Sequence, residues 1–283
     1  MGRSRPDRLP TDVYTTRVFG DDFIPDRSRL IGASDTAHQV SFGKHYDSAN
    51  GEWREVAAKP FLGPRAAEKA KNETRLTAVL RDLGFRTLSP VLVAEGDGVA
   101  ILLTNYVPGL IGANALPLEA HPSTALGESV GETAASIAAT LGRLHASHVT
   151  HGDAQIKNFG LKTHGPAGQE PIVMDLEKAT HHKNTNPAHR EKAEYYFNRA
   201  TQGDLRVLSD SMGFRSYGGR GIRRARKHFT DTIIEPYQET VRSLDQSLLP
   251  QSYEQAYTSF YKGREMAHYI EAKNGKGDAQ AAA

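Results

Sequence analysis

The stretch His151-Gly152-Asp153-Ala154-Gln155-Ile156-Lys157-Asn158 decides the fold of this chain. A segment with helical periodicity precedes it, and a short apolar run typical of a strand follows it. Farther along, Asp175 comes directly after the apolar run Ile172-Val173-Met174. Two carboxylates and one amide at the ends of such elements suit Mg²⁺, which prefers hard oxygen ligands. One carboxylate can instead accept the proton of an attacking hydroxyl group, and the remaining alternative is a chance spacing of three polar loop residues.

This set of residues resembles the catalytic loop and metal-binding motif of the protein-kinase-like superfamily. The loop of that family reads His-Arg-Asp, or His-Gly-Asp in antibiotic (aminoglycoside), sugar and lipopolysaccharide kinases and in RIO-type atypical kinases, with an asparagine five residues after the aspartate. The resemblance implies that Asp153 is the catalytic base, Asn158 a magnesium ligand and Asp175 the main magnesium ligand. It also implies ATP and Mg²⁺ as cofactors.

The N-terminal part of the chain supplies the lysine and the glutamate that this resemblance requires. The run Val56-Ala57-Ala58-Lys59 resembles the Val-Ala-Ile-Lys signature, whose lysine holds the α- and β-phosphates. The following helix offers Glu68 and Glu73 as partners of Lys59. Glu73 interrupts the apolar face of that helix, where an unpaired carboxylate would be costly. We therefore expect Glu73 to pair with Lys59, although a lone lysine on a strand would be interpreted as solvent-exposed.

Three further segments complete the expected nucleotide site. Gly32, Ser34 and Thr36 lie in a first hairpin that could meet phosphate, although it has one glycine where protein kinases have several. Asn105-Tyr106-Val107 resembles the family's hinge, whose backbone would hold the adenine. Asp204 resembles the helix aspartate that braces the catalytic loop, and a plain helix N-cap is the alternative.

The order of the expected elements indicates an α+β protein. The resemblance implies a bilobal protein-kinase-like fold, with a five-stranded antiparallel sheet and one helix in the N-lobe and a mainly helical C-lobe. We expect strands at residues 29–32, 39–42, 55–61, 91–94 and 99–104, a helix at 64–83, and later helices at 123–147, 204–212, 230–244 and 252–272. The expected organisation is an irregular N-terminal extension over residues 1–28, an N-lobe over 29–105, a C-lobe over 106–273 and a disordered tail over 274–283.

Composition excludes several other classes of protein. The chain has 283 residues and no cysteine, which rules out disulfides, thiolate zinc sites, iron–sulfur clusters and a cysteine nucleophile. Its apolar runs are far shorter than the roughly 20 residues of a membrane span. No apolar signal core follows the basic N-terminus. These features predict a cytoplasmic protein without a membrane span.

The sequence departs from ordinary protein kinases around the catalytic loop. Gln155 stands where protein Ser/Thr kinases usually have lysine, and Leu176-Glu177 replaces Phe-Gly after the metal-binding aspartate. No Ala-Pro-Glu motif follows. We therefore expect an ATP-dependent phosphotransferase that transfers the γ-phosphate to a hydroxyl of a sugar, small molecule or protein. Transfer of AMP on the same fold is a second enzymatic possibility.

A basic segment supports an alternative of a different class. The net charge is +2, yet residues 215–227 carry six basic side chains and no acidic one. One possibility is a non-catalytic pseudokinase or adaptor that binds an acidic partner or nucleic acid through this segment, although no nucleic-acid signature accompanies it. On a kinase-like plan, the segment is a docking patch for an acidic or phosphate-bearing partner, built from Arg220, Arg223, Arg224 and Lys227. His181, His182 and His189 could bind zinc, but a solvated loop is the better interpretation because no carboxylate partner is fixed by spacing.

Overall fold

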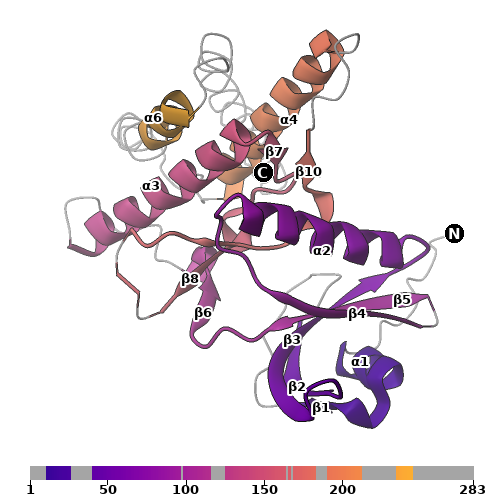
Figure 1. Cartoon of the computed structure of the whole chain (residues 1–283). Helices are drawn as coiled ribbons and strands as arrows, with labels where there is room; N and C mark the ends of the chain where they lie inside the picture. The colour runs from indigo at the N-terminus through magenta and orange to yellow at the C-terminus, as the bar shows by residue number, and fades with distance from the viewer. Residues whose placement is uncertain are drawn as a thin grey trace, which may run out of the picture. The chain divides into compact units, whose positions relative to one another are not determined.

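The computed structural model describes residues 11–26, 40–96, 98–115, 125–163, 165–166, 168–182, 190–211 and 234–244 (Figure 1). The chain divides into two compact units, unit 1 over residues 1–108 and unit 2 over residues 109–283. Within the described ranges, no helix is long and apolar enough to cross a membrane.

Unit 1 is built on a five-stranded antiparallel sheet in the order β1-β2-β3-β5-β4. The two hairpin partners β2 (Ser41–Asp47) and β3 (Glu52–Leu62) are joined by a turn at Gly51, whose φ of +67° favours glycine. The other strands are β1 (Phe23–Pro25), β4 (Pro90–Gly96) and β5 (Val99–Asn105). The predicted α+β fold with a five-stranded antiparallel sheet is confirmed.

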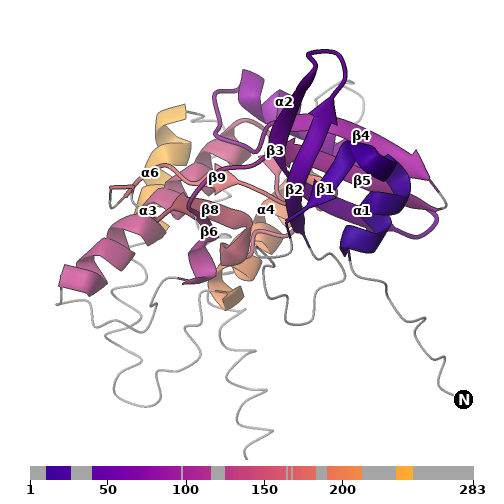
Figure 2. The same cartoon turned by 90° about the horizontal axis from the view of Figure 1, so that it is seen from below.

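The two faces of the sheet are covered by different helices (Figures 1 and 2). Against one face packs α1 (Thr11–Phe19), whose Tyr14, Val18 and Phe19 contact a buried cluster. Against the other packs α2 (Ala66–Asp82). The period of two along β3 sends alternate side chains to opposite faces. The cluster under α1 contains Phe23, Val56, Ala58, Ile101 and Leu103, and the cluster under α2 contains Phe61, Ala66, Ala70, Ala100 and Leu102.

The expectation of an irregular segment over residues 1–28 is wrong for its second half. Residues 11–25 form α1, a 3₁₀ turn (Gly20–Asp22) and β1, and β1 is the edge strand of the sheet. The helix is short and rich in threonine, so its local signal is weak, and burial of its apolar side chains on the sheet provides the driving force. The strand expected at residues 29–32 lies outside the described residues.

Strand β2 extends farther than the expected residues 39–42. Gly43 interrupts the apolar alternation and makes the strand look shorter in sequence. In the fold this glycine faces β1, where a Cβ atom would lie 2.4 Å from the carbonyl oxygen of Ile24. The missing side chain therefore allows β1 to join the sheet.

Unit 2 is mainly helical, with α3 (Ala125–Ala146), α4 (Arg190–Ser211) and α6 (Glu235–Leu244). Helices α3 and α6 pack closely at Gly142, where a Cβ atom would lie 2.8 Å from the carbonyl oxygen of Tyr237. Helix α3 forms where expected, and α6 coincides with most of the expected 230–244. The helix expected at residues 252–272 and the tail at 274–283 lie outside the described residues.

Short strands and 3₁₀ turns carry the loops of unit 2. The strands β6 (Leu110–Gly112), β8 (Phe159–Lys162) and β9 (Ile172–Val173) form one sheet, and β7 (Val149–Thr150) pairs with β10 (Thr180–His181). The 3₁₀ turns are η2 (Ala113–Ala115), η3 (Ile156–Asn158) and η4 (Leu176–Lys178). These pairings bring the segment after β7 and the segment after β9 into one region of unit 2.

Candidate active site

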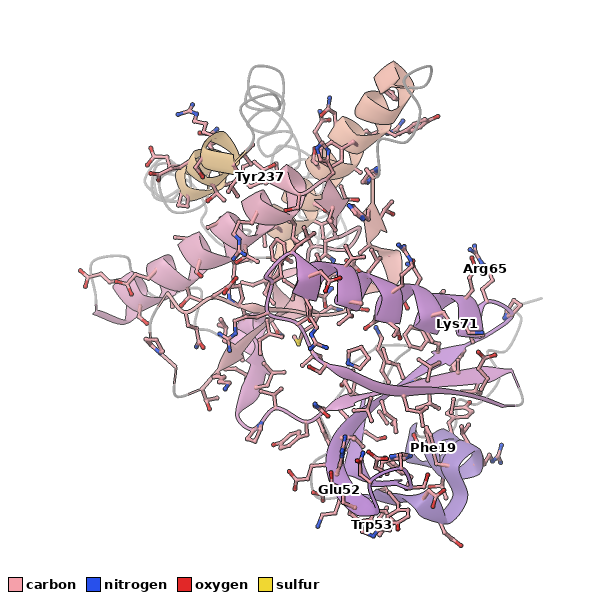
Figure 3. All side chains as sticks on the ribbon, viewed as in Figure 1. Phe19, Glu52, Trp53, Arg65, Lys71 and Tyr237 are labelled. Atoms are coloured by element: carbon pink, nitrogen blue, oxygen red, sulfur yellow. The ribbon has the colours of Figure 1, made fainter. Side chains whose placement is uncertain are left out.

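In unit 1 the structure joins Lys59 of β3 to Glu73 of α2. The Lys59 ammonium lies 2.6 Å from a Glu73 carboxylate oxygen, and the two side chains are only 14% and 10% exposed. The ammonium also lies over the Phe61 ring, 4.9 Å from its centroid. Glu68, the other candidate, instead pairs with Arg65 at the exposed end of α2 (Figure 3). The periodicity argument thus selects the glutamate that the fold places beside Lys59.

In unit 2 the loop after β7 is held in shape by its own hydrogen bonds. The Asn158 side-chain amide donates to the Asp153 carbonyl oxygen over 2.8 Å. The backbone N–H groups of Gln155 and Asn158 close two further turns, to Asp153 and Gln155 respectively. The N–H of Met174 donates to the Asn158 carbonyl oxygen over 2.9 Å. The structure therefore brings together the loop of residues 151–158 and the segment that carries Asp175.

Asp175 adopts a backbone conformation that is uncommon outside glycine. Its φ of +58° and ψ of +58° lie in the left-handed region, directly before η4. This region costs roughly 1–2 kcal/mol for an ordinary residue, and aspartate tolerates it better than most. Such strain is often found at functional sites, where the surrounding structure imposes it.

Both carboxylate oxygens of Asp153 are hydrogen-bonded. One accepts from the side-chain amide of Gln155 and the other from the ammonium of Lys178, each over 2.9 Å. Lys178 is half-exposed, with 55% of its side-chain surface accessible, whereas Asp153 is 16% exposed. The hydrogen bond to Asp153 raises the pKa of Lys178 against the opposing effect of partial burial, and the charges of Asp153, Glu177 and Asp175 raise it further.

Lys178 is a functional candidate that the sequence reasoning missed. It stands three residues after Asp175, at the end of η4, whereas the position at which protein Ser/Thr kinases usually have lysine is occupied by Gln155. Nothing in the linear sequence pairs Lys178 with Asp153. The one feature of the sequence that could have indicated Lys178 is its place directly after Asp175-Leu176-Glu177.

Gly152 explains why the loop reads His-Gly-Asp. Its φ is +75°, and a Cβ atom there would lie 2.3 Å from the carbonyl oxygen of Lys178. Both the backbone conformation and the close approach exclude a side chain. The glycine therefore permits η4 to lie against the catalytic loop.

A buried carboxylate on α4 braces the loop from within unit 2. Asp204 accepts hydrogen bonds from the backbone N–H groups of His151 and Gly152, over 2.6 and 2.8 Å. Because Asp204 lies inside α4, the N-cap alternative is wrong and the brace is confirmed. His145 contacts Asp204 through Nε2 at 3.2 Å and the Tyr237 hydroxyl through Nδ1 at 2.7 Å. Tyr237 lies on α6 (Figure 3). Burial raises the pKa of Tyr237 well above its usual range, and the Asp204 charge adds to this.

The structure describes only some of the residues predicted to bind the nucleotide. The backbone N–H of Asn105 donates to the Ser89 carbonyl oxygen and that of Tyr106 to the Glu55 carbonyl oxygen. The backbone N–H groups of Asn105 and Tyr106 therefore both form hydrogen bonds within unit 1. Val107 follows them, and the phosphate-loop residues Gly32, Ser34 and Thr36 lie outside the described residues.

The histidines after Asp175 do not form a metal cluster in the described part of the chain. His182 Nε2 lies 2.8 Å from the Thr150 hydroxyl, and burial lowers the pKa of His182. His181 belongs to β10, and His189 lies outside the described residues. Across the described ranges, no three His, Cys, Asp or Glu side chains converge as a metal site would require.

Comparison with known proteins identifies the family. The model of the Lipopolysaccharide kinase (Kdo/WaaP) family matches residues 27–201, which is more than half of the chain. The chain belongs to this family. Among solved structures, a similar chain is WaaP in complex with acyl carrier protein, with 20% sequence identity, a TM-score of 0.44, and coverage of 81% of this chain and 89% of that chain. A search of the curated proteins finds no match.

Membership of the Kdo/WaaP family confirms the predicted resemblance to lipopolysaccharide kinases. The chain is accordingly a kinase-like phosphotransferase that acts on a hydroxyl, and a kinase family implies the use of ATP. The matched range contains Lys59, Glu73, Asp153, Asn158 and Asp175. It ends before Asp204, so the loop brace lies beyond the part that the family model covers.

Proposed function

We propose that this Kdo/WaaP-family chain transfers the γ-phosphate of ATP to a hydroxyl of a sugar acceptor, with Asp153 as the base. The observation that carries the proposal is the hydrogen-bonded loop in which Asn158 is fixed to Asp153 and also to the segment that carries Asp175. A base and two oxygen ligands fixed in this way suit phosphoryl transfer, because its catalysis depends mainly on positioning and on charge stabilisation.

The reaction follows from the roles of these groups. The acceptor hydroxyl gives its proton to the Asp153 carboxylate as its oxygen forms a bond to the γ-phosphorus. The bond between the γ-phosphorus and the bridging oxygen of ADP breaks on the opposite side, and ADP leaves with that electron pair. Lys59, held by Glu73, would bind the α- and β-phosphates, and Val107 is the expected backbone contact of the adenine.

The residues present fit a magnesium ion. Because Nδ2 of Asn158 donates to the Asp153 carbonyl oxygen, the orientation of the amide is fixed and its Oδ1 remains for a metal. That oxygen and the Asp175 carboxylate are hard ligands, and Mg²⁺ commonly uses few protein ligands with phosphates and waters. When bound, the ion would neutralise phosphate charge.

The basic segment at residues 215–227 lies outside the described residues, and its role is part of this proposal. Arg220, Arg223, Arg224 and Lys227 would attract an acceptor or partner that bears phosphate or carboxylate groups. Reversing these four charges should raise the acceptor KM and leave the nucleotide affinity unchanged. An unchanged acceptor KM would remove this docking role.

The proposed function is tested with the purified full chain, γ-labelled ATP and sugar acceptors, including lipopolysaccharide oligosaccharides. We expect labelled phosphate on the acceptor and release of ADP; release of pyrophosphate would instead indicate AMP transfer. Asp175→Asn should abolish transfer, whereas Glu239→Gln, an exposed residue of α6, should not change it. Equal activity of wild type and Asp175→Asn would contradict the proposal.

A further inference from the structure

The catalytic loop of unit 2 is associated with a lysine that comes from outside the loop. Lys178 donates to a carboxylate oxygen of Asp153 over 2.9 Å, while the Gln155 amide occupies the other oxygen. The two donors fix the plane of the carboxylate. Of the two, only Lys178 carries a charge.

The position of Lys178 is fixed through its backbone as well as its side chain. Its carbonyl oxygen lies so close to Gly152 that no side chain fits there. It also ends η4, the turn that begins directly after the left-handed Asp175. Lys178 is therefore held against both segments that carry the predicted base and the predicted metal ligand.

The ammonium group of Lys178 retains capacity for a ligand. It has three N–H donors, of which one bonds to Asp153. More than half of the side-chain surface is exposed, so the ammonium can also donate outward. The hydrogen bond to Asp153, together with the charges of Asp153, Glu177 and Asp175, favours an ammonium over a neutral amine at this place.

The geometry points to Lys178 as a catalytic cation in addition to Lys59. Lys178 binds an oxygen of the γ-phosphoryl group during its transfer and also orients Asp153. This inference rests on the proposed function. The acceptor hydroxyl must contact Asp153 and attack the γ-phosphorus, so a cation 2.9 Å from that carboxylate lies beside the reacting atoms. It would stabilise charge on the phosphoryl oxygens as the acceptor proton moves to Asp153 and ADP departs.

Four variants of the full chain test the inference. Lys178→Gln removes the charge and Lys178→Arg keeps it. Lys157→Gln removes the neighbouring lysine of the loop, and Lys162→Gln removes an exposed lysine of β8 as a matched control. The measurements are kcat, the acceptor KM, and the dissociation constants of ATP and ADP by calorimetry with Mg²⁺ present. Circular dichroism melting checks that each variant is folded.

We expect Lys178→Gln to lower kcat about 100-fold, the loss typical of removing one donor from a developing charge. It should weaken ATP binding several-fold and leave ADP binding unchanged, because only ATP carries the γ-phosphate. Lys178→Arg should recover part of both losses, and Lys162→Gln should match wild type.

Three results would overturn the inference. The first is an unchanged kcat in folded Lys178→Gln, and the second is an equal loss of ATP and ADP affinity in that variant. The third is a loss of the preference for ATP over ADP that occurs in Lys157→Gln and not in Lys178→Gln. Failure of the proposed function is distinguishable. If wild type transfers no phosphate to any acceptor, that function fails, while the ratio of ATP to ADP affinity still decides the role of Lys178.

Discussion

Two of the lysine–carboxylate pairs in the described part of the chain differ in their surroundings. Lys59 and Glu73 meet at 2.6 Å between a strand and a helix of unit 1, and both side chains are largely buried. Lys178 and Asp153 meet at 2.9 Å in unit 2, where the lysine is half-exposed. A buried pair depends on both of its members, whereas an open pair can exchange partners at little cost. The first pair is therefore suited to hold a geometry, and the second to meet a substrate.

The largest expected effect is a loss of turnover when the Lys178–Asp153 pair is broken at Asp153. Asp153→Ala should lower kcat about 1,000-fold, because it removes the proposed base. The dissociation constant of ATP should change much less, since the proposed phosphate contacts of Lys59 would remain. Steady-state kinetics and nucleotide titration measure the two quantities. Comparable losses in both would show that Asp153 acts mainly in nucleotide binding.

Breaking the Lys59–Glu73 pair should instead lower the stability of the fold. Glu73→Ala should reduce the free energy of unfolding by about 3 kcal/mol, because it leaves the Lys59 charge buried without its carboxylate partner. Chemical denaturation measures this loss. Glu68→Ala, which breaks an exposed pair on the same helix, is the matched control and should leave stability nearly unchanged. If both variants lose stability equally, the first pair has no special structural role.

The second pair should also be sensitive to its glycine neighbour. Gly152→Ala places a methyl group against the Lys178 carbonyl oxygen at a positive φ, so we expect a loss of about 2 kcal/mol in unfolding free energy. Turnover should fall as η4 moves away from Asp153. Gly203→Ala, at an open position in α4, provides the control. Wild-type turnover in Gly152→Ala would contradict the close approach described above.

The smallest expected effect is a pH dependence of the second pair. The raised pKa of Lys178 means that its contribution to stability is complete below the ordinary lysine value of about 10.4. That contribution is lost as the pH rises through the higher value of the folded protein. The stability difference between wild type and Lys178→Gln should therefore be small and constant from pH 7 to 9, and should decline only above the ordinary lysine value of about 10.4. A difference that already disappears near pH 8 would show that the pair is not ionic.

Much of the site could be predicted because its residues interrupt or punctuate local patterns. Glu73 breaks an apolar helix face, and Asp153, Asn158 and Asp175 stand at fixed places around short apolar runs. Lys59 lies within strand β3. For Glu73 the charge of the residue conflicts with its apolar surroundings unless a partner is present, and that conflict is visible in the sequence. The other residues are predicted from the spacing of the kinase-like motifs.

The rest depends on contacts between distant segments. The pairing of Lys178 with Asp153 requires the left-handed turn at Asp175 and the space left by Gly152. Helix α1 forms on the sheet, and its own sequence signals it weakly. Helix α4 begins at Arg190 rather than at the expected residue 204, so its predicted start was wrong, whereas the predicted brace role of Asp204 is confirmed.

The hydrogen-bonded chain from Asp204 through His145 to Tyr237 ties the loop of residues 151–158 to residues beyond the range that the family model matches. The catalytic loop is held by a residue three positions past the family match, which is itself held through α6, more than thirty residues farther on. A chain shortened to the matched range would retain every predicted catalytic side chain and lose the groups that keep the loop in place. The range that the family model matches therefore ends before the residues that hold this loop in place.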